Sequence, residues 1–405
     1  MSSNDWTKAR KRPYGRLPLG ETAPYQRLNL APSKRFGLTP QVYIIFGLSS
    51  PKTLQTLKLS EFKFELPSSL IAAQPLVNRD DSRMMVINRK TQTIEHRQFR
   101  DILDLFSEGD SLVLNNSKVF RARMYGNKEK TGAMIEVFLL RELNPTMRMW
   151  DALVDPARKI RVGNKLYFGE NDELIAEVVD NTTSRGRTIR FIFDGDDEGY
   201  RKALTTFGET PLPKEMGRDV QPEDEERYQT IFAKRVGAVA APTAGMHFSR
   251  AVLKRMELRG IETPEITLHV GLGVFKPVEV EDLTKHKPES EFFEVDENAA
   301  QVINRSLQNQ QRVCAVGTTT LRALEASMSA GRKVKPTTGW TDKFMFPPHN
   351  FQLADSLLTN FQLPESTSLM IASSFAGQEF LREVYRIAIS EKYRFFAYGD
   401  ALLIL

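Results

Sequence analysis

Two hydrophobic patterns divide this 405-residue chain, and each constrains the fold of its own stretch. Between residues 118 and 206, short apolar runs alternate with turn signals such as Gly126-Asn127 and Asp194-Gly195, and helical periodicity is nearly absent. Short strands at this spacing are typical of a small antiparallel barrel or sandwich. After residue 206, strands alternate with helical segments, which is typical of helices packed on a mixed sheet.

We therefore predict an α/β main domain with a mixed sheet, formed by residues 57–117 and 207–405, and a small inserted antiparallel β-barrel domain at 118–206. The barrel strands are expected at 136–140, 150–154, 165–168, 174–179 and 188–193. The main-domain strands are expected at 84–88, 111–114, 265–270, 312–316 and 369–372. The helices are expected at 99–105, 251–259, 297–309, 318–328 and 376–390.

The first 56 residues differ from the rest of the chain in charge. They carry nine Lys or Arg against two acidic residues, whereas the whole chain has a net charge of +5, so residues 57–405 sum to −2. The basic pI of about 9.1 is therefore no evidence that the folded part binds RNA. Residues 1–56 show no sustained periodicity, and we expect a disordered or non-native basic extension. The alternative for residues 1–56 is a basic arm that binds RNA.

Several functional classes are disfavoured by what the sequence lacks. No apolar run approaches the roughly 20 residues that span a bilayer. The single cysteine, Cys314, lies in an apolar run, which excludes an intramolecular disulfide and fits a reducing cytoplasm. No CxxC, HxxxH or HxH spacing occurs, so no metal site is expected. No Walker loop or GxSxG elbow occurs, and Gly271-Leu-Gly273 lacks the third glycine of a dinucleotide fingerprint.

Two of the five histidines lie beside clusters of small residues. His247 belongs to the segment Ala-Pro-Thr-Ala-Gly-Met-His-Phe at 241–248, and His269 precedes Gly271 and Gly273. Small residues let a ligand approach the backbone, and an imidazole can exchange a proton near neutral pH. On the residues alone, core histidines satisfied by hydrogen bonds are the simpler interpretation.

Further polar groups follow predicted strands or turns. Gly317-Thr318-Thr319 opens a helix, whose unpaired N–H groups suit a carboxylate or phosphate; simple capping by the threonines is the alternative. Asn115 ends a strand, where α/β ligand sites commonly gather. Four arginines lie beside turns and are candidates for phosphate contacts, with solvated surface as the alternative: Arg79, Arg83, Arg121 and Arg123.

Taken together, these segments resemble the S-adenosylmethionine:tRNA ribosyltransferase-isomerase family of queuosine biosynthesis. The resemblance runs in order through nearly all of 57–405. It rests on the segments 64–67, 74–76, 79–80, 82–83, 112–115, 121–123, 156–158, 208–209, 211–213, 227–229, 241–248, 266–275, 316–319, 357–361 and 393–400. The fold that it implies, an α/β domain with an inserted β-barrel, agrees with the periodicity.

The resemblance also implies a reaction. The ribosyl part of S-adenosylmethionine would move to 7-aminomethyl-7-deazaguanine at the tRNA wobble position and rearrange to an epoxycyclopentanediol, giving epoxyqueuosine with release of adenine and methionine. S-adenosylmethionine is then a co-substrate, and no resident cofactor is implied. We expect a monomeric cytoplasmic enzyme with tRNA as its macromolecular partner and no membrane association.

This reaction needs a base that removes the proton next to the sulfonium, so we assign His247 or His269 to proton transfer. Gly317–Thr319 would hold an anionic group such as the methionine carboxylate, with Asn115, Gly271 and Gly273 also binding substrate. The four arginines would hold tRNA phosphates.

The chain departs from the family pattern at two places. It has Pro288 and Glu289 where a histidine and a methionine are expected, and Gln362 where Asn-Phe-His-Leu-Pro is expected. These departures make a non-catalytic tRNA-binding paralogue one alternative. A separate alternative is an unrelated small-molecule transferase, which would turn over without tRNA. Leu57 aligns with the family's initial methionine, and we hypothesise a non-AUG start there, with 1–56 from an upstream reading frame.

Overall fold

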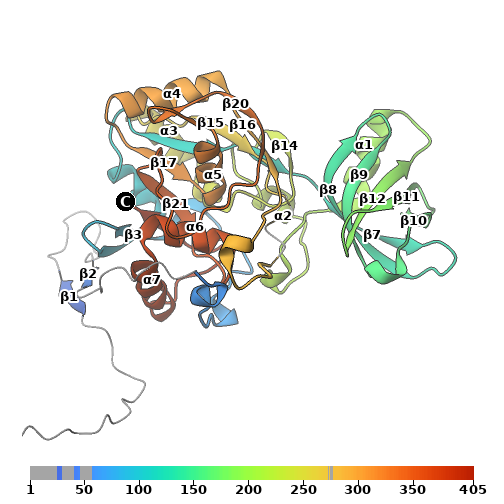
Figure 1. The fold of residues 1–405 in the computed structure, drawn as a ribbon, viewed down its shortest axis with the longest axis horizontal. Helices are drawn as coiled ribbons and strands as arrows, with labels where there is room; N and C mark the ends of the chain where they lie inside the picture. The colour runs from blue at the N-terminus through green and yellow to red at the C-terminus, as the bar shows by residue number, and fades with distance from the viewer. Residues whose placement is uncertain (1–24, 30–40, 46–56, 272, 274–276) are drawn as a thin grey trace, which may run out of the picture.

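An eleven-stranded mixed sheet forms the centre of the main domain (Figure 1). The computed structural model describes residues 25–29, 41–45, 57–271, 273 and 277–405. In sheet order the strands are β1 (Tyr25–Asn29), β2 (Gln41–Ile45), β4 (Thr93–Gln98), β3 (Arg83–Asn88), β22 (Ala401–Ile404), β21 (Ser356–Asn360), β17 (Val313–Val316), β5 (Ser111–Asn115), β15 (Glu265–Leu268), β16 (Glu291–Val295) and β20 (Thr337–Thr341).

Parallel pairing joins β21, β17, β5 and β15 at the centre of this sheet, and antiparallel pairs such as β21–β22 and β15–β16 flank them, so the predicted mixed sheet is confirmed. Every residue of β5, β17 and β21 is buried, because helices cover both faces. Cys314 on β17 is fully buried in this layer. Burial raises the pKa of its thiol to about 12.

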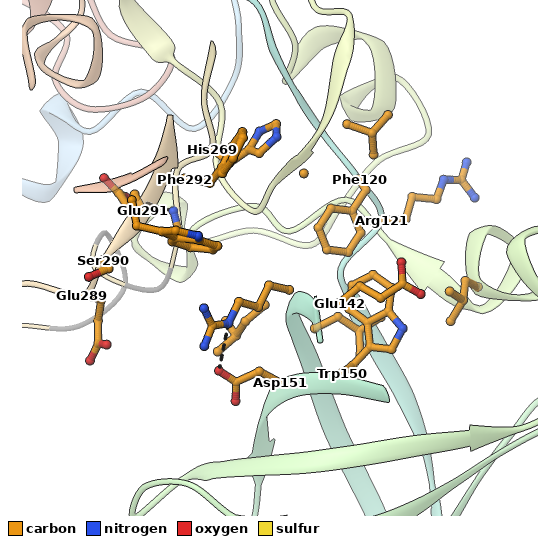
Figure 2. A pocket seen from close by; sticks show the side chains of 18 of the residues that line it. Phe120, Arg121, Glu142, Trp150, Asp151, His269, Glu289, Ser290, Glu291 and Phe292 are labelled. Carbon is orange, nitrogen blue, oxygen red and sulfur yellow. Dashed lines mark hydrogen bonds and ion pairs between the residues drawn. The ribbon is translucent and has the colours of Figure 1, made fainter. Parts of the chain in front are cut away.

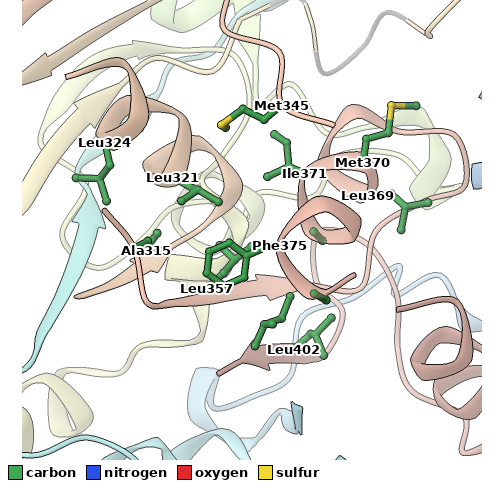
Figure 3. Close-up of a cluster of buried hydrophobic side chains, with 14 of the residues drawn as sticks. Ala315, Leu321, Leu324, Met345, Leu357, Leu369, Met370, Ile371, Phe375 and Leu402 are labelled. Carbon is green, nitrogen blue, oxygen red and sulfur yellow. The ribbon is translucent and has the colours of Figure 1, made fainter. Parts of the chain in front are cut away.

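Side chains alternate between the two faces of the sheet. One face packs against α4 (Glu297–Gln308), α5 (Thr318–Ala326), α6 (Thr367–Ala376) and α7 (Gln378–Ser390). Figure 3 shows part of this layer, with Leu321 of α5 and Phe375 of α6 beside Leu357 of β21. The other face packs against α3 (Arg250–Leu258) and the 3-10 helix η4 (Phe99–Asp104). Ser249 caps α3 by accepting a hydrogen bond from the Val252 N–H.

The inserted domain is a closed antiparallel barrel. Its strands, in sheet order, are β10 (Lys165–Phe168), β11 (Leu174–Asn181), β12 (Gly186–Ile192), β9 (Met149–Asp155), β8 (Met134–Asn144), β7 (Arg123–Lys128) and β13 (Gly208–Glu209). Pairing of β10 with β7 closes it. The predicted barrel is therefore confirmed, and its interior is filled by apolar side chains that alternate along the strands.

Several elements differ from the prediction. The main-sheet strands β4, β16, β20, β21 and β22 and the barrel strand β7 were not expected. Residues 369–372, expected as a strand, lie within helix α6, because this short apolar run is buried on all sides and carries no period that distinguishes helix from strand. Helix α1 (Asp197–Phe207) was missed within 118–206. Its N-cap Asp196 accepts a hydrogen bond from the Gly199 N–H, and Tyr200 packs on the barrel core.

The described part of the N-terminal segment forms two strands. β1 pairs with β2, and β2 extends the main sheet by pairing with β4. The sequence predicted no strand in 1–56, so this expectation is corrected for β1 and β2. The rest of that segment lies outside the described residues, and the basic extension stays a prediction. None of the helices that the structure describes is long and apolar enough to cross a membrane.

Two short parallel strands, β6 (Ser117–Val119) and β14 (Arg235–Ala238), lie where the chain passes between the domains. A separate small hairpin pairs β18 (Met328–Ser329) with β19 (Lys333–Val334), and α2 is the short helix Asp224–Arg227. β6 follows β5 directly and leads into the barrel, so it couples the carboxyl edge of the main sheet to the inserted domain.

The contribution of the contact between α1 and the barrel to stability can be tested by removing one hydrogen bond. The Trp150 indole N–H donates to the Tyr200 hydroxyl at 2.9 Å in the barrel core. Tyr200→Phe leaves that N–H buried without a partner, and we expect it to lower the free energy of unfolding by about 1–3 kcal/mol in denaturant titrations. Tyr167→Phe, at a half-buried barrel tyrosine whose hydroxyl makes no hydrogen bond with the described residues, is the matched control and should change it by less than about 0.5 kcal/mol. Equal effects would contradict this account.

Candidate active site

A cavity of about 960 Å³ lies between the barrel and the main domain (Figure 2). The barrel side contributes aromatic and charged side chains, among them Phe120, Arg121, Arg141, Glu142, Trp150 and Asp151. The main domain contributes Val236, Gly237, His269, Gly271, Glu289, Ser290, Glu291, Phe292 and Trp340. The cavity lies beyond the carboxyl ends of parallel strands, where ligand sites of open α/β sheets occur.

His269 follows directly after β15 and points into this cavity. Its Nδ1 is 2.7 Å from the Ser117 hydroxyl, and its ring stacks on Phe292 with centroids 5.6 Å apart. Its Nε2 has no hydrogen-bond partner among the described residues. One ring nitrogen is thus held by the protein, and the other is available to a ligand.

The pKa of His269 is lowered to about 4, first by burial and second by the positive charge of Arg235. The ring is therefore neutral at pH 7. A neutral imidazole with a free nitrogen can accept a proton from a bound molecule.

Gly237 leaves room for this nitrogen. A Cβ at residue 237 would lie 2.6 Å from Nε2 of His269, and the residue has a φ of +155°. Any side chain here would therefore overlap the imidazole. Glycine is required at this position by contact with the ring as well as by backbone conformation.

Asn115 positions His269 from the neighbouring strand. Its Oδ1 accepts hydrogen bonds from the N–H groups of Leu268 at 3.0 Å and Ser117 at 3.1 Å. Its Nδ2 donates to the Leu268 carbonyl at 2.9 Å and lies 3.3 Å from the Thr319 hydroxyl. The predicted substrate-binding Asn115 thus has its amide fully engaged with the protein, where it orders the residues around the cavity.

His247 lies elsewhere. It is 5% exposed and lines a separate cavity of about 30 Å³ with Arg79 and Ser82. Its Nδ1 is 2.9 Å from the Ser82 hydroxyl, and its Nε2 is 3.2 Å from Oδ1 of Asn360. Burial lowers its pKa to about 4. The two predicted catalytic histidines therefore line separate cavities, and both ring nitrogens of His247 are occupied by protein partners.

Gly271 belongs to the cavity wall and Gly273 does not line it. The Gly271 N–H donates to Oε1 of Glu291 at 3.0 Å. Glu291 is buried and pairs through its other oxygen with Arg322 of α5. This carboxylate, which the sequence did not single out, therefore joins the loop after β15 to helix α5.

The Gly317–Thr319 segment forms the start of α5, as predicted, next to Asn115. Gly317 has a φ of +99° and caps the helix without a side-chain hydrogen bond. The Thr319 hydroxyl meets the Asn115 amide, and the Thr318 hydroxyl is 3.2 Å from Ser368. None of the three lines the 960 Å³ cavity, so Asn115 is what connects this helix start to the His269 site.

The four predicted phosphate-binding arginines all contact their own chain. Arg79 donates to the carbonyls of Gln229, Met246 and Glu226. Arg83 donates to the Glu391 carbonyl, and Arg123 to that of Leu212. Arg121 pairs with Glu225 and lines the cavity. Only Arg121 is thus placed beside the His269 site.

Of the residues that depart from the family pattern, one lies near His269 and another lies near His247. Glu289 lines the large cavity, whereas Gln362 donates from Nε2 to the Thr359 hydroxyl and the Asn360 carbonyl. Gln362 therefore supports the strand end that carries Asn360, the partner of His247.

Sequence reasoning missed the side chains that meet across the cavity. The Arg141 guanidinium of the barrel lies 5.1 Å from the ring centre of Trp340 of the main domain, and 3.9 Å from Asp151. Trp340 also meets Phe292 edge-on at 5.8 Å. Ser117 and Phe292 carry no motif of their own, and only the fold brings them to His269. Within the described ranges, no three His, Cys, Asp or Glu side chains form a group that could hold a metal ion.

The different access of the two histidines is testable by chemical modification. Diethyl pyrocarbonate attacks a neutral imidazole nitrogen that is free to react, so we expect His269 to be modified well before His247. Gly237→Ala should slow the modification of His269, because a methyl group at this position takes the space beside Nε2 and displaces the ring from it. Gly331→Ala is the control, since it also has a positive φ but nothing within 4 Å. Mass spectrometry of peptides reads out both sites, and equal rates at His247 and His269 would contradict the geometry.

Comparisons with known proteins agree on one family. A family model described as queuosine biosynthesis protein matches residues 59–404. The S-adenosylmethionine:tRNA ribosyltransferase-isomerases of Flavobacterium psychrophilum and Cytophaga hutchinsonii are each 60% identical over 349 residues, covering 86% of this chain and 100% of theirs. The crystal structure of S-adenosylmethionine tRNA ribosyltransferase from Thermotoga maritima is 34% identical, with a TM-score of 0.49 over 85% of this chain and 100% of that one. The chain therefore belongs to the queuosine biosynthesis protein family.

Proposed function

We propose that this chain transfers and isomerises the ribosyl group of S-adenosylmethionine onto 7-aminomethyl-7-deazaguanine in tRNA, and that the 960 Å³ cavity is its active site. The product is epoxyqueuosine-tRNA, with adenine and methionine released. The observation that carries the assignment of the site is His269, a neutral imidazole with one free nitrogen in a cavity with aromatic walls. The relatives named above, at 60% identity over their whole length, support the reaction.

The cavity suits the substrates in size and in the nature of its walls. Its volume of about 960 Å³ lies at the upper end of the usual range for ligand pockets. Phe292 and Trp340 lie on one side, and Phe120 and Trp150 on the other. Aromatic faces stack with nucleobases for about 1–3 kcal/mol per base and attract cations such as a sulfonium.

His269 is the proposed base. Its Nε2 accepts the proton from the carbon next to the sulfonium. The amino nitrogen of the deazaguanine bonds to C1′ of the ribosyl group as the bond to adenine breaks, and the deprotonated carbon closes the five-membered ring on C1′, which frees the ring oxygen. That oxygen then forms the epoxide by displacing the sulfonium, so methionine leaves. The Ser117 hydroxyl holds Nδ1 throughout and fixes the ring. Burial and, second, the positive charge of Arg235 lower the pKa of His269, which keeps the proposed base unprotonated before reaction.

The remaining assignments concern groups that hold the substrate. Gly317–Thr319 does not line the cavity, and its role in binding the methionine carboxylate stays a proposal that rests on the uncapped first N–H groups of α5. Gly271 lies in the cavity wall and is proposed to contact substrate there. Asn115 is proposed as a positioning residue for His269. Gly273 and the arginines Arg79, Arg83 and Arg123 have no contact with the cavity that supports a substrate role.

We also propose that the enzyme works as a monomer in the cytoplasm, with S-adenosylmethionine as a co-substrate and no resident cofactor. The single cysteine, buried and unpaired, fits a reducing compartment. A tRNA-binding paralogue without activity is not favoured, because relatives at 60% identity are named as the enzyme.

The choice between the two histidines can be tested by turnover. His269→Ala should lower the rate of adenine release from S-adenosylmethionine and precursor-bearing tRNA by about 10²-fold or more, because it removes the base. His247→Ala should mainly lower stability, since it empties a buried hydrogen-bonded position. Full turnover in purified, folded His269→Ala would overturn the assignment.

The pH dependence provides a second test. A histidine base acts in its neutral form. The titration of His269 should therefore leave kcat/KM unchanged above about pH 5 and lower it only as the pH approaches the pKa of about 4. Arg235→Gln removes a positive charge and should move this acid limb to higher pH. Lys234→Gln is the matched control, because Lys234 is not among the charges that shift His269. An unchanged limb in Arg235→Gln would argue against His269.

A further inference from the structure

A second cavity, of about 480 Å³, adjoins the active site. The two cavities share Phe120, Arg121, Thr205 and Val236 in their linings. Phe120 and Val236 give this shared wall an apolar edge, and Val236 is 62% exposed. A molecule that enters the first cavity can therefore extend into the second along this shared wall.

The second cavity has an excess of positive charge. Its lining includes Arg79, Lys118, Arg121 and Arg250 against two carboxylates, Glu225 and Glu226. Arg121 is neutralised by Glu225, and Arg79 is held by three carbonyls. Lys118 of β6 and Arg250 of α3 are exposed, and their side chains make no ion pair or hydrogen bond with the described part of the chain. These two cations are free to meet an anion.

Thr230 is an independent sign of a ligand. It lines this cavity and is 4% exposed, and its hydroxyl has no hydrogen-bond partner in the described ranges. Buried hydroxyls are nearly always paired. Rotation about one side-chain bond lets this hydroxyl donate to an acceptor in the cavity.

We propose that this second cavity, the phosphate cleft, binds the RNA phosphate next to the modified nucleotide. Lys118 and Arg250 supply its charge, and Thr230 supplies a hydrogen-bond donor. The inference rests on the proposed function, because that function makes tRNA the substrate. It assigns the phosphate contacts to residues other than Arg79, Arg83 and Arg123. The guanidinium groups of these three arginines donate hydrogen bonds to backbone carbonyls of the protein.

The test is equilibrium binding of precursor-bearing tRNA between about 50 and 200 mM salt. In the double variant Lys118→Ala/Arg250→Ala, affinity should fall at least roughly tenfold, because each substitution removes a charged hydrogen bond to the RNA. The slope of log affinity against log salt should become shallower by about 0.7 for each phosphate that is no longer neutralised. Arg255→Ala is the matched control, since Arg255 is an exposed arginine five residues further along the same helix. It should bind as wild type.

The variant Thr230→Val tests the hydrogen bond from the hydroxyl separately from the charges of Lys118 and Arg250. This variant should bind the tRNA more weakly with an unchanged salt slope, while its stability without tRNA is unchanged or increased. Wild-type affinity and slope in the double variant would overturn the phosphate cleft. Adenine release by the wild-type enzyme is measured separately, so that a failure of the proposed function is distinguished from a failure of the cleft.

Discussion

The hydrogen bonds of one amide side chain, that of Asn115, determine the arrangement of the residues around His269. Asn115 ends β5 and bonds both the N–H and the carbonyl of Leu268, so it continues the pairing of β5 and β15 beyond the last backbone bonds. The same amide holds the N–H of Ser117 and meets the Thr319 hydroxyl. Because Asn115 is buried, losing any of these bonds leaves a polar group without water. His269, its hydrogen-bond partner Ser117 and the start of α5 are therefore all positioned by Asn115.

The division of the chain into two domains explains the character of the site. The parallel strands of the main domain are buried on both faces and supply a rigid edge for His269. The barrel supplies the opposite wall, where Trp150 and Phe120 face the cavity. A site enclosed in this way strengthens electrostatic interactions, since less water surrounds the reacting groups. The depressed pKa of His269 is one result of that enclosure.

Much of the fold could be predicted from the sequence, because strand alternation and helix caps are local signals. The barrel strands β9, β10 and β11 and the capped helix α3 were expected close to their observed bounds. Whether the apolar run at 369–372 forms a helix or a strand could not be decided from the sequence, because a segment that is buried on all sides has no hydrophobic periodicity. In the site, His269 could be proposed from its small neighbours, but Ser117, Gly237 and Phe292 reach it only through tertiary contacts. The sequence could not show that His269 has a free ring nitrogen and His247 does not. The partners of the two His247 nitrogens are Ser82 and Asn360, which are distant in the chain.

The burial of Cys314 has a practical consequence. Its thiol is fully buried in the central sheet and carries a pKa of about 12, so almost none of it exists as the reactive thiolate at neutral pH. It is the only cysteine in the chain. Thiol-directed dyes would thus leave the native protein unlabelled, and a cysteine pair introduced on the barrel and on the main domain would carry both fluorophores. Energy transfer between them would report the distance between the domains as substrates bind, without first removing a natural cysteine.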